Sequence, residues 1–206
     1  MAENYSEEGN STKSDGILIS LIYYPVITLG PGKRLGIWTQ GCSRHCAGCI
    51  SKHTWEFDER KRVSWSRIES VLSENILKTS SLTISGGEPF DQIEELHRLL
   101  KLARQIGYTD ILLYTGYTIE ELKEKYENKF EEITNLISAL IDGRFVQDLD
   151  TDLIWKGSEN QRMFIYENNQ DIRKTYEEYM TRTKDNKLQL VTFEGVIYIV
   201  GILRQK

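Results

Sequence analysis

The sequence predicts an α/β protein whose sheet forms part of a (βα) barrel, and three observations lead to this class. Short apolar, β-branched runs alternate with amphipathic stretches of helical spacing through the middle of the chain. This order favours parallel strands joined by crossover helices. The chain has 206 residues, fewer than the about 250 of a full eight-stranded barrel. A partial barrel is therefore expected.

Two strands are expected at the start of the domain, at residues 17–24 and 35–39, because both runs are apolar and β-branched. A turn at 29–32 separates them, and a loop at 41–52 follows the second. A capping box from Ser66 to Glu69 then predicts the first helix.

Two further strands are expected at residues 82–85 and 111–114. The first runs into the loop Gly86-Gly87-Glu88-Pro89, and the second runs into the turn Thr115-Gly116. Catalytic loops of α/β folds lie at the carboxyl ends of the parallel strands. Both segments are therefore expected on the same face of the sheet.

Helical patterns follow each of these loops. Asp91 with Glu94 predicts the start of a helix that ends at Gly107. Thr118 with Glu121 predicts the start of the next helical stretch, and residues 130–140 predict one more helix. Residues 139–141 then lead into Asp142-Gly143.

The ends of the chain differ from this central pattern. Residues 1–16 are polar and are expected to form a disordered tail. The remainder, 17–206, is expected to be a single domain with a core at about 23–165 and an extension at about 171–206. A helix is expected at 173–182, and a β-hairpin is expected around Glu194-Gly195.

Composition excludes some classes of protein. The net charge of −5 argues against a nucleic-acid binder that neutralises phosphates. No apolar run approaches the about 18 residues that a membrane span needs, and the N-terminus lacks the apolar core of a signal peptide. A cytoplasmic protein without nucleic-acid or membrane partners is expected.

The three cysteines of the chain, Cys42, Cys46 and Cys49, lie in one short loop. Thiolates are the ligands of iron–sulfur clusters, and short spacers let one loop reach three corners of a cubane. A zinc site is the main alternative, with His45 or His53 as the fourth ligand. Ordinary buried cysteines would not need such clustering.

The cysteine spacing together with the later Gly-Gly-Glu-Pro loop resembles the radical S-adenosylmethionine (SAM) superfamily. The resemblance implies a partial barrel of the radical SAM type. It also implies that Cys42, Cys46 and Cys49 hold a [4Fe–4S] cluster whose open iron chelates SAM. The residues implied to lie against SAM are Gly86, Gly87, Glu88 and Pro89. Thr115 and Gly116 follow the next strand and are expected either to line the SAM pocket or to form a simple turn. Asp142 is a candidate for contact with SAM or the partner, with a structural role as the alternative.

Within that superfamily the chain is similar to the anaerobic ribonucleotide reductase activating proteins, from about Tyr23 to Phe164. The segments that carry this likeness are 24–26, 30–32, 41–49, 52–55, 85–89, 115–117, 142–149, 153–158 and 160–162. The block at 142–149 is the most specific of them. The tail from about 171 has no counterpart in the short activators.

This resemblance implies an oxidoreductase that reductively cleaves SAM to a 5′-deoxyadenosyl radical and makes a glycyl radical on a large partner enzyme. Flavodoxin or ferredoxin is the implied electron donor. Two alternatives remain open from the sequence. One is a radical SAM enzyme that modifies a peptide or small molecule, and the other is a non-catalytic module stabilised by zinc.

Overall fold

The computed structural model describes residues 15–185, 187–193 and 195–202, so most of the tail expected at 1–16 lies outside the described residues. The strands are β1 (Ile17–Val26), β2 (Arg34–Thr39), β3 (Arg62–Val63), β4 (Ser81–Gly86), β5 (Asp110–Tyr114), β6 (Ala139–Asp142), β7 (Arg162–Ile165), β8 (Gln189–Phe193) and β9 (Val196–Val200). The helices are α1 (Trp65–Ile76), α2 (Ile93–Ile106), α3 (Ile119–Thr134) and α4 (Gln170–Met180), with short 3-10 helices η1 (Lys52–Thr54), η2 (Glu59–Lys61) and η3 (Pro89–Gln92).

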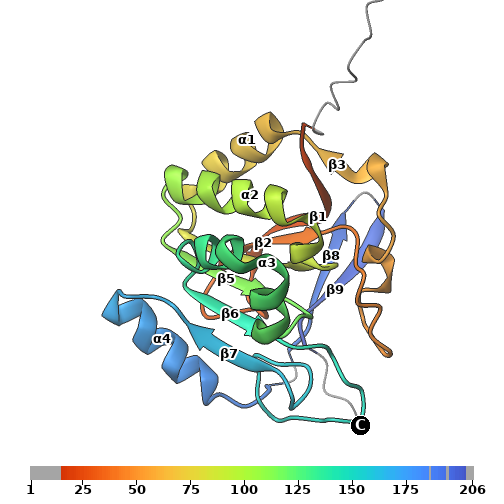
Figure 1. The fold of residues 1–206 in the computed structure, drawn as a ribbon, viewed down its shortest axis with the longest axis vertical. Helices are drawn as coiled ribbons and strands as arrows, with labels where there is room; N and C mark the ends of the chain where they lie inside the picture. Colours follow the sequence, from red (N-terminus) through yellow and green to blue (C-terminus); the bar gives the residue numbers. More distant parts are fainter. Residues whose placement is uncertain (1–14, 186, 194, 203–206) are drawn as a thin grey trace, which may run out of the picture.

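The main sheet has the strand order β3-β1-β2-β4-β5-β6-β7. Its centre is parallel from β2 through β4 and β5 to β6, whereas β1, β3 and β7 are antiparallel to their neighbours. A separate two-stranded sheet, β8-β9, forms the C-terminal hairpin. These pairings confirm the α/β class, the parallel centre and the hairpin (Figure 1).

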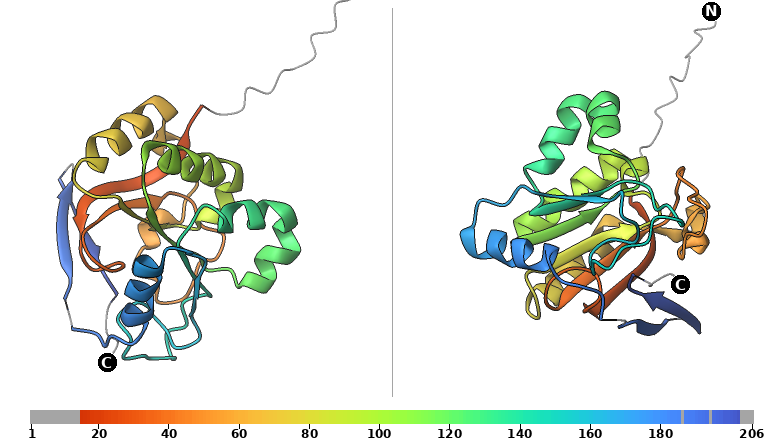
Figure 2. Two further views of the ribbon diagram at one scale, coloured as in Figure 1. Left: turned by 90° about the vertical axis from the view of Figure 1, so that its left-hand side faces the viewer. Right: turned by 90° about the horizontal axis from the view of Figure 1, so that it is seen from below.

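Apolar side chains lie on both faces of the sheet, since alternate strand residues point to opposite sides. Both faces are therefore covered by other elements. In β5, Ile111 and Leu113 pack into the large core beneath α1, α2 and α3, whereas Leu112 packs into a second cluster with Tyr176 of α4. The hairpin covers a third cluster that includes Trp38 of β2. Figure 2 shows α4 and the hairpin on the side of the sheet away from α2.

Several predicted helix ends are confirmed, and others are displaced. The capping box at Thr118 and Glu121 is present, and α2 ends at Gly107 with a left-handed φ of 117°. The first helix, by contrast, is capped by Ser64, whose side chain accepts a hydrogen bond from the Arg67 amide. The box predicted from Ser66 starts two residues too late.

The helix predicted at residues 130–140 is confirmed as far as Thr134 and is wrong beyond it. Helix α3 runs from Ile119 to Thr134 with a kink at Glu127, and β6 begins at Ala139. The apolar run that ends at Ile141 is buried on both faces of the sheet, as parallel strands usually are. Such a run has no period-two pattern, so it can be mistaken for a buried helix.

Helix α4 is joined to the sheet through a buried polar network. Arg34 is fully buried and pairs with Asp110 at 2.5 Å. The Tyr176 hydroxyl of α4 donates to Asp110 Oδ1 at 2.6 Å and accepts from Arg34 Nη2 at 3.2 Å. Burial raises the pKa of Tyr176 well above its ordinary value, so the hydroxyl remains a donor. Tyr176 thus provides hydrogen-bond partners for both side chains of the buried ion pair between Arg34 and Asp110.

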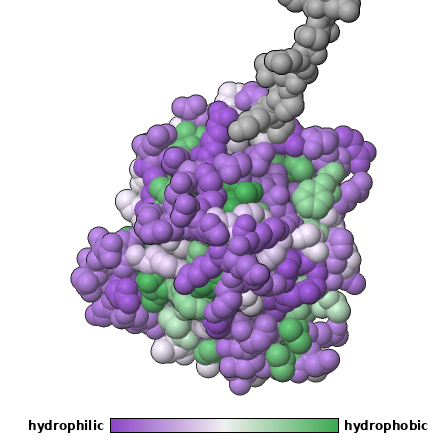
Figure 3. Space-filling view, in the orientation of Figure 1, coloured by the Kyte–Doolittle hydropathy of each residue, from purple (hydrophilic) through white to green (hydrophobic). Residues whose placement is uncertain are grey.

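The surface over α2 and α3 is mainly hydrophilic, with small, separate apolar areas (Figure 3). Among the described residues, no helix is long and apolar enough to span a bilayer.

Candidate functional site

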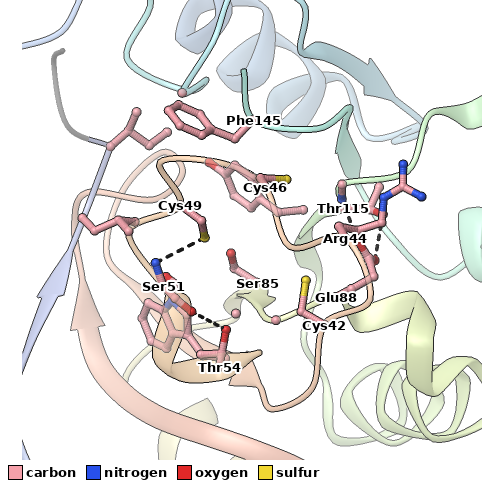
Figure 4. A pocket seen from close by; sticks show the side chains of 18 of the residues that line it. Cys42, Arg44, Cys46, Cys49, Ser51, Thr54, Ser85, Glu88, Thr115 and Phe145 are labelled. Carbon is pink, nitrogen blue, oxygen red and sulfur yellow. Dashed lines mark hydrogen bonds between the residues drawn. The ribbon is translucent and has the colours of Figure 1, made fainter. Parts of the chain in front are cut away.

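A cavity of about 560 Å³ lies at the carboxyl ends of the parallel strands. This size is within the usual ~300–1,000 Å³ of cofactor pockets. The predicted site residues that line it are Cys42, Cys46, Cys49, Gly86, Gly87, Glu88, Thr115 and Gly116. The structure therefore brings together three loops that are far apart in the sequence, as the strand order predicts (Figure 4).

The cysteine loop leaves the end of β2 and returns through η1. Its base is closed by two backbone hydrogen bonds, from the Gly41 amide to the Thr54 carbonyl at 2.8 Å and from the Cys42 amide to the Trp55 carbonyl at 3.0 Å. The three thiols are free of disulfides. In Figure 4 the sulfur atoms of Cys42 and Cys49 point into the space between the loops.

A polar cluster fixes the first part of this loop to helices on the large-core side. Asp91 accepts a hydrogen bond from the Ser43 amide at 2.6 Å and another from the Tyr117 hydroxyl at 2.9 Å. The guanidinium of Arg44 lies 4.2 Å above the centre of the Tyr117 ring and pairs with Glu121 at 3.0 Å. Asp91 thus serves the cysteine loop. The helix predicted to start at Asp91, α2, instead has Gln92 as its N-cap residue, and Glu88 caps the short helix η3.

The two glycines of the Gly-Gly-Glu-Pro loop are required by contact between loops. A Cβ on Gly86 would lie 2.3 Å from the Thr39 amide nitrogen, and a Cβ on Gly87 would lie 2.0 Å from the Gly41 carbonyl oxygen. Both distances are shorter than any real contact of that kind. The Gly87 amide also donates to the Thr39 carbonyl at 2.9 Å. The loop therefore forms a direct backbone contact with the base of the cysteine loop.

Glu88 links this loop to the turn after β5. Its buried carboxylate accepts hydrogen bonds from the Phe90 amide at 3.0 Å, the Thr115 hydroxyl at 2.8 Å and the Gly116 amide at 2.7 Å. Its backbone amide donates to the Gly41 carbonyl at 2.8 Å. Burial raises the pKa of Glu88 to about 7. Glu88 thus connects its own loop to the cysteine loop and to the Thr115-Gly116 turn.

Two predicted residues lie beside the cavity without lining it. Pro89 is buried at the start of η3. Asp142 is fully buried, accepts a hydrogen bond from the Ile119 amide at 2.9 Å and pairs with Arg162 at 2.5 Å. These contacts anchor the first turn of α3 and strand β7. Asp142 therefore has a structural role at the start of α3.

Sequence reasoning missed several residues that line the cavity. Arg44 and Trp55 both carry buried ring or guanidinium N–H groups, Nε and Nε1, that have no partner among the described residues. Arg44 lies in the predicted cysteine loop and Trp55 follows it, but nothing in the sequence shows that they contribute to the cavity wall. Phe145 and Gln161 also line the cavity, and the segments containing them had been singled out by the resemblance.

The geometry does not support a site for a single zinc ion. In the described part of the chain, no group of three or more His, Cys, Asp or Glu side chains is arranged to hold one metal ion. The His45 ring packs against Trp55 at 4.7 Å, and the His53 ring packs against Tyr198 at 5.6 Å. A cubane is larger than one ion and takes thiolates that stand farther apart.

The donor set of the cavity fits an iron–sulfur cluster with an organic cofactor beside it. Three free thiols of one loop face a space large enough for a nucleoside-sized ligand. Burial raises the pKa of the Cys42 thiol. A metal cation would offset this because it binds the thiolate form.

Comparison with known proteins agrees with this fit. The 4Fe-4S single cluster domain family matches residues 28–164, which include all three cysteines and the other cavity loops. The chain is a member of this family of iron–sulfur proteins.

A narrower assignment comes from curated relatives. The chain is 36% identical over 148 residues to the anaerobic ribonucleoside-triphosphate reductase-activating protein of Escherichia coli (strain K12), covering 68% of this chain and 93% of the relative. It is 34% identical over 156 residues to that of Pasteurella multocida (strain Pm70), with 70% and 95% covered. The phage T4 protein of the same name is 29% identical over 140 residues, with 66% and 85% covered. This chain belongs to the family of anaerobic ribonucleoside-triphosphate reductase-activating proteins.

Proposed function

We propose that this chain is a radical SAM activating enzyme that generates a glycyl radical on an anaerobic ribonucleoside-triphosphate reductase. The observation that carries the proposal is the convergence of three free thiols and the Gly-Gly-Glu-Pro loop on one cavity. Family membership supports it, since the relatives are named for activating that reductase.

In this proposal Cys42, Cys46 and Cys49 bind three irons of a [4Fe–4S] cluster, and SAM occupies the rest of the cavity. Cluster and SAM together supply one-electron chemistry that yields a hydrogen-abstracting radical. The SAM-facing residues are Gly86, Gly87, Glu88, Thr115 and Gly116, with Pro89 and Asp142 supporting their loops.

Side chains of the protein fix the shape of the cavity and form its apolar wall. Glu88 fixes the three loops by its hydrogen bonds, so the binding surface is formed before any ligand arrives. Apolar side chains of Leu29, Trp38 and Ile202 line the wall and limit water near a reactive centre.

The finer structural expectations are part of the same proposal. The open sheet is taken as a partial barrel of radical SAM type within one domain at 17–206, with an extension from about 171. A cytoplasmic location is supported by free thiols, which persist in reducing compartments. Reduced flavodoxin or ferredoxin is the proposed electron donor.

The test begins with anaerobic reconstitution using iron and sulfide. We expect about four irons per chain, as a single cubane requires, and a low-temperature EPR signal of the reduced cluster that changes when SAM is added. Incubation with the reductase, SAM and a reductant should then give a glycyl radical signal on the reductase together with 5′-deoxyadenosine. A Cys46→Ser variant is the matched control.

Different outcomes separate the alternatives. One bound zinc and no response to SAM would contradict the enzyme assignment. SAM cleavage without a radical on any reductase would leave a radical SAM enzyme and overturn the activating role.

A further inference from the structure

The C-terminal hairpin, β8 and β9, is the part of the site that the family match does not include. The match ends at residue 164, and 68% of this chain already covers 93% of the Escherichia coli relative. Figure 2 shows the hairpin standing along one side of the sheet, beside the end of β1. The hairpin therefore lies outside the residues that the family model covers.

The inward face of the hairpin is fixed to the domain. Val191 and Val200 are 1% and 2% exposed and belong to the apolar cluster next to β1 and β2. The Gln189 side chain donates to the Pro25 carbonyl at 2.6 Å, and the Thr28 hydroxyl donates to the Val200 carbonyl at 3.1 Å. The hairpin is thus a supported platform whose position does not depend on a ligand.

The outward face of the same hairpin is apolar and uncovered. Leu190 is 69% exposed, Ile197 is 67% exposed and Ile199 is 48% exposed. Leu190 lies opposite Ile199, and Thr192 lies opposite Ile197, so these side chains form one patch across both strands. Neither strand contains a charged residue. Exposed strands in soluble proteins usually carry charges that prevent association, and a contiguous apolar patch indicates a contact surface.

This outward face is continuous with the cavity. Ile199, Val200, Gly201 and Ile202 all line the cavity that contains the cysteine loop. Ile199 belongs both to the cavity wall and to the exposed face. A polypeptide that reaches the cavity along this wall must therefore lie against the hairpin.

We propose that the outward face of the hairpin is the docking surface for the protein substrate, and that it binds an apolar, extended segment of the reductase next to its radical-bearing glycine. This inference rests on the proposed function and adds the place where the partner binds. An extended segment is the form that fits a flat two-stranded surface, since its alternate side chains can meet the cross-strand rows. The lack of charge on both strands selects an apolar segment.

The experiment uses a double variant, Leu190→Thr with Ile197→Thr, in reconstituted full-length holoenzyme. Threonine keeps the strand preference and removes the apolar contact, and neither residue lines the cavity. We expect unchanged SAM cleavage in the absence of reductase. The reductase concentration that gives half-maximal radical formation should rise at least about tenfold, with the same yield at saturation. Leu77→Thr, at an 88% exposed leucine after α1, is the matched control.

A second variant protects the test against a hairpin that unfolds. Thr192→Arg keeps every apolar side chain and places a charge on the same face, so it should raise the half-maximal concentration in the same way. Unchanged half-maximal concentrations in both variants would overturn the docking surface. So would a dimeric wild type that becomes monomeric in the variants while activation stays the same, because the face would then serve self-association. If the wild type cleaves SAM but never forms the reductase radical, the proposed function itself fails.

Discussion

Replacing Glu88 with glutamine isolates the effect of a buried charge at the junction of the three loops. Glutamine keeps the size of the side chain and one acceptor oxygen, and it does not titrate. The wild-type carboxyl has its pKa raised by burial from 4.5 to about 7. In the unfolded chain this burial is absent.

The pKa of Glu88 is higher in the folded chain than in the unfolded chain, so its contribution to stability decreases as pH rises. As pH rises above 4.5 the unfolded chain loses its proton first, so the wild type loses stability until the folded group also ionises near pH 7. With 1.36 kcal/mol per pKa unit, the loss between about pH 5 and about pH 8 is roughly 2.5 kcal/mol. Glu88 is 1% exposed, so solvent screening does not reduce this value.

The variant also carries a penalty that does not depend on pH. Its amide nitrogen would face the Gly116 amide, which now donates to the carboxylate at 2.7 Å. Leaving that buried donor unpaired costs about 1–3 kcal/mol. The variant is therefore expected to be less stable than wild type near pH 5, and the difference should shrink or reverse near pH 8.

Urea unfolding of the metal-free, reduced chain at both pH values measures this difference. Glu69→Gln, at an exposed glutamate of α1, controls for the change in net charge. The reasoning would be refuted if the difference in the free energy of unfolding between variant and wild type were equal at both pH values. It would also be refuted if the wild type became more stable than the variant by a larger margin at the higher pH.

Three further outcomes are expected. Cys46→Ser should lower SAM cleavage more than about a hundredfold, because even the outer partners of metal ligands are worth 10–100-fold, and iron analysis with EPR checks it. Gly87→Ala should destabilise the chain by at least about 2 kcal/mol, because the new Cβ would lie 2.0 Å from the Gly41 carbonyl oxygen; an unchanged urea midpoint would contradict the loop contact. Tyr176→Phe should cost about 1–3 kcal/mol by removing one hydrogen bond to Asp110 and another from Arg34, and thermal unfolding measures it.

The cavity loops could be predicted from the sequence because each one depends on local information. The cysteine spacing and the Gly-Gly-Glu-Pro segment are contiguous, and each follows an apolar strand whose carboxyl end must point to the same edge. The parallel centre of the sheet, the Thr118 capping box and the two paired strands of the hairpin are equally local. The structure confirms all of these elements.

The roles of the other site residues could not be predicted, because they depend on contacts between segments that are distant in the sequence. Asp91 resembles a helix cap in sequence, yet its carboxylate bonds to Ser43 and Tyr117. Asp142 resembles a loop residue of the site, yet it is buried against Arg162. No local pattern distinguishes these cases, because the deciding partner lies many residues away. The contacts of Arg44 with Tyr117 and Glu121 are a further example.

The buried pair Arg34 and Asp110 has a consequence for where this protein can be cut. A fragment that stops at residue 164, where the family match ends, would keep the cysteine loop, the Gly-Gly-Glu-Pro loop and the Thr115-Gly116 turn. It would lose Tyr176 with the rest of α4, and the hairpin residues that line the cavity. The fragment would expose the apolar cluster around Leu112 and remove a hydroxyl that now satisfies both members of the pair. Such a fragment would contain Cys42, Cys46 and Cys49 on a sheet with one apolar face exposed. Helix α4 lies beyond the matched family domain but packs against its sheet. A stable truncated form of this protein should therefore extend at least through Met180.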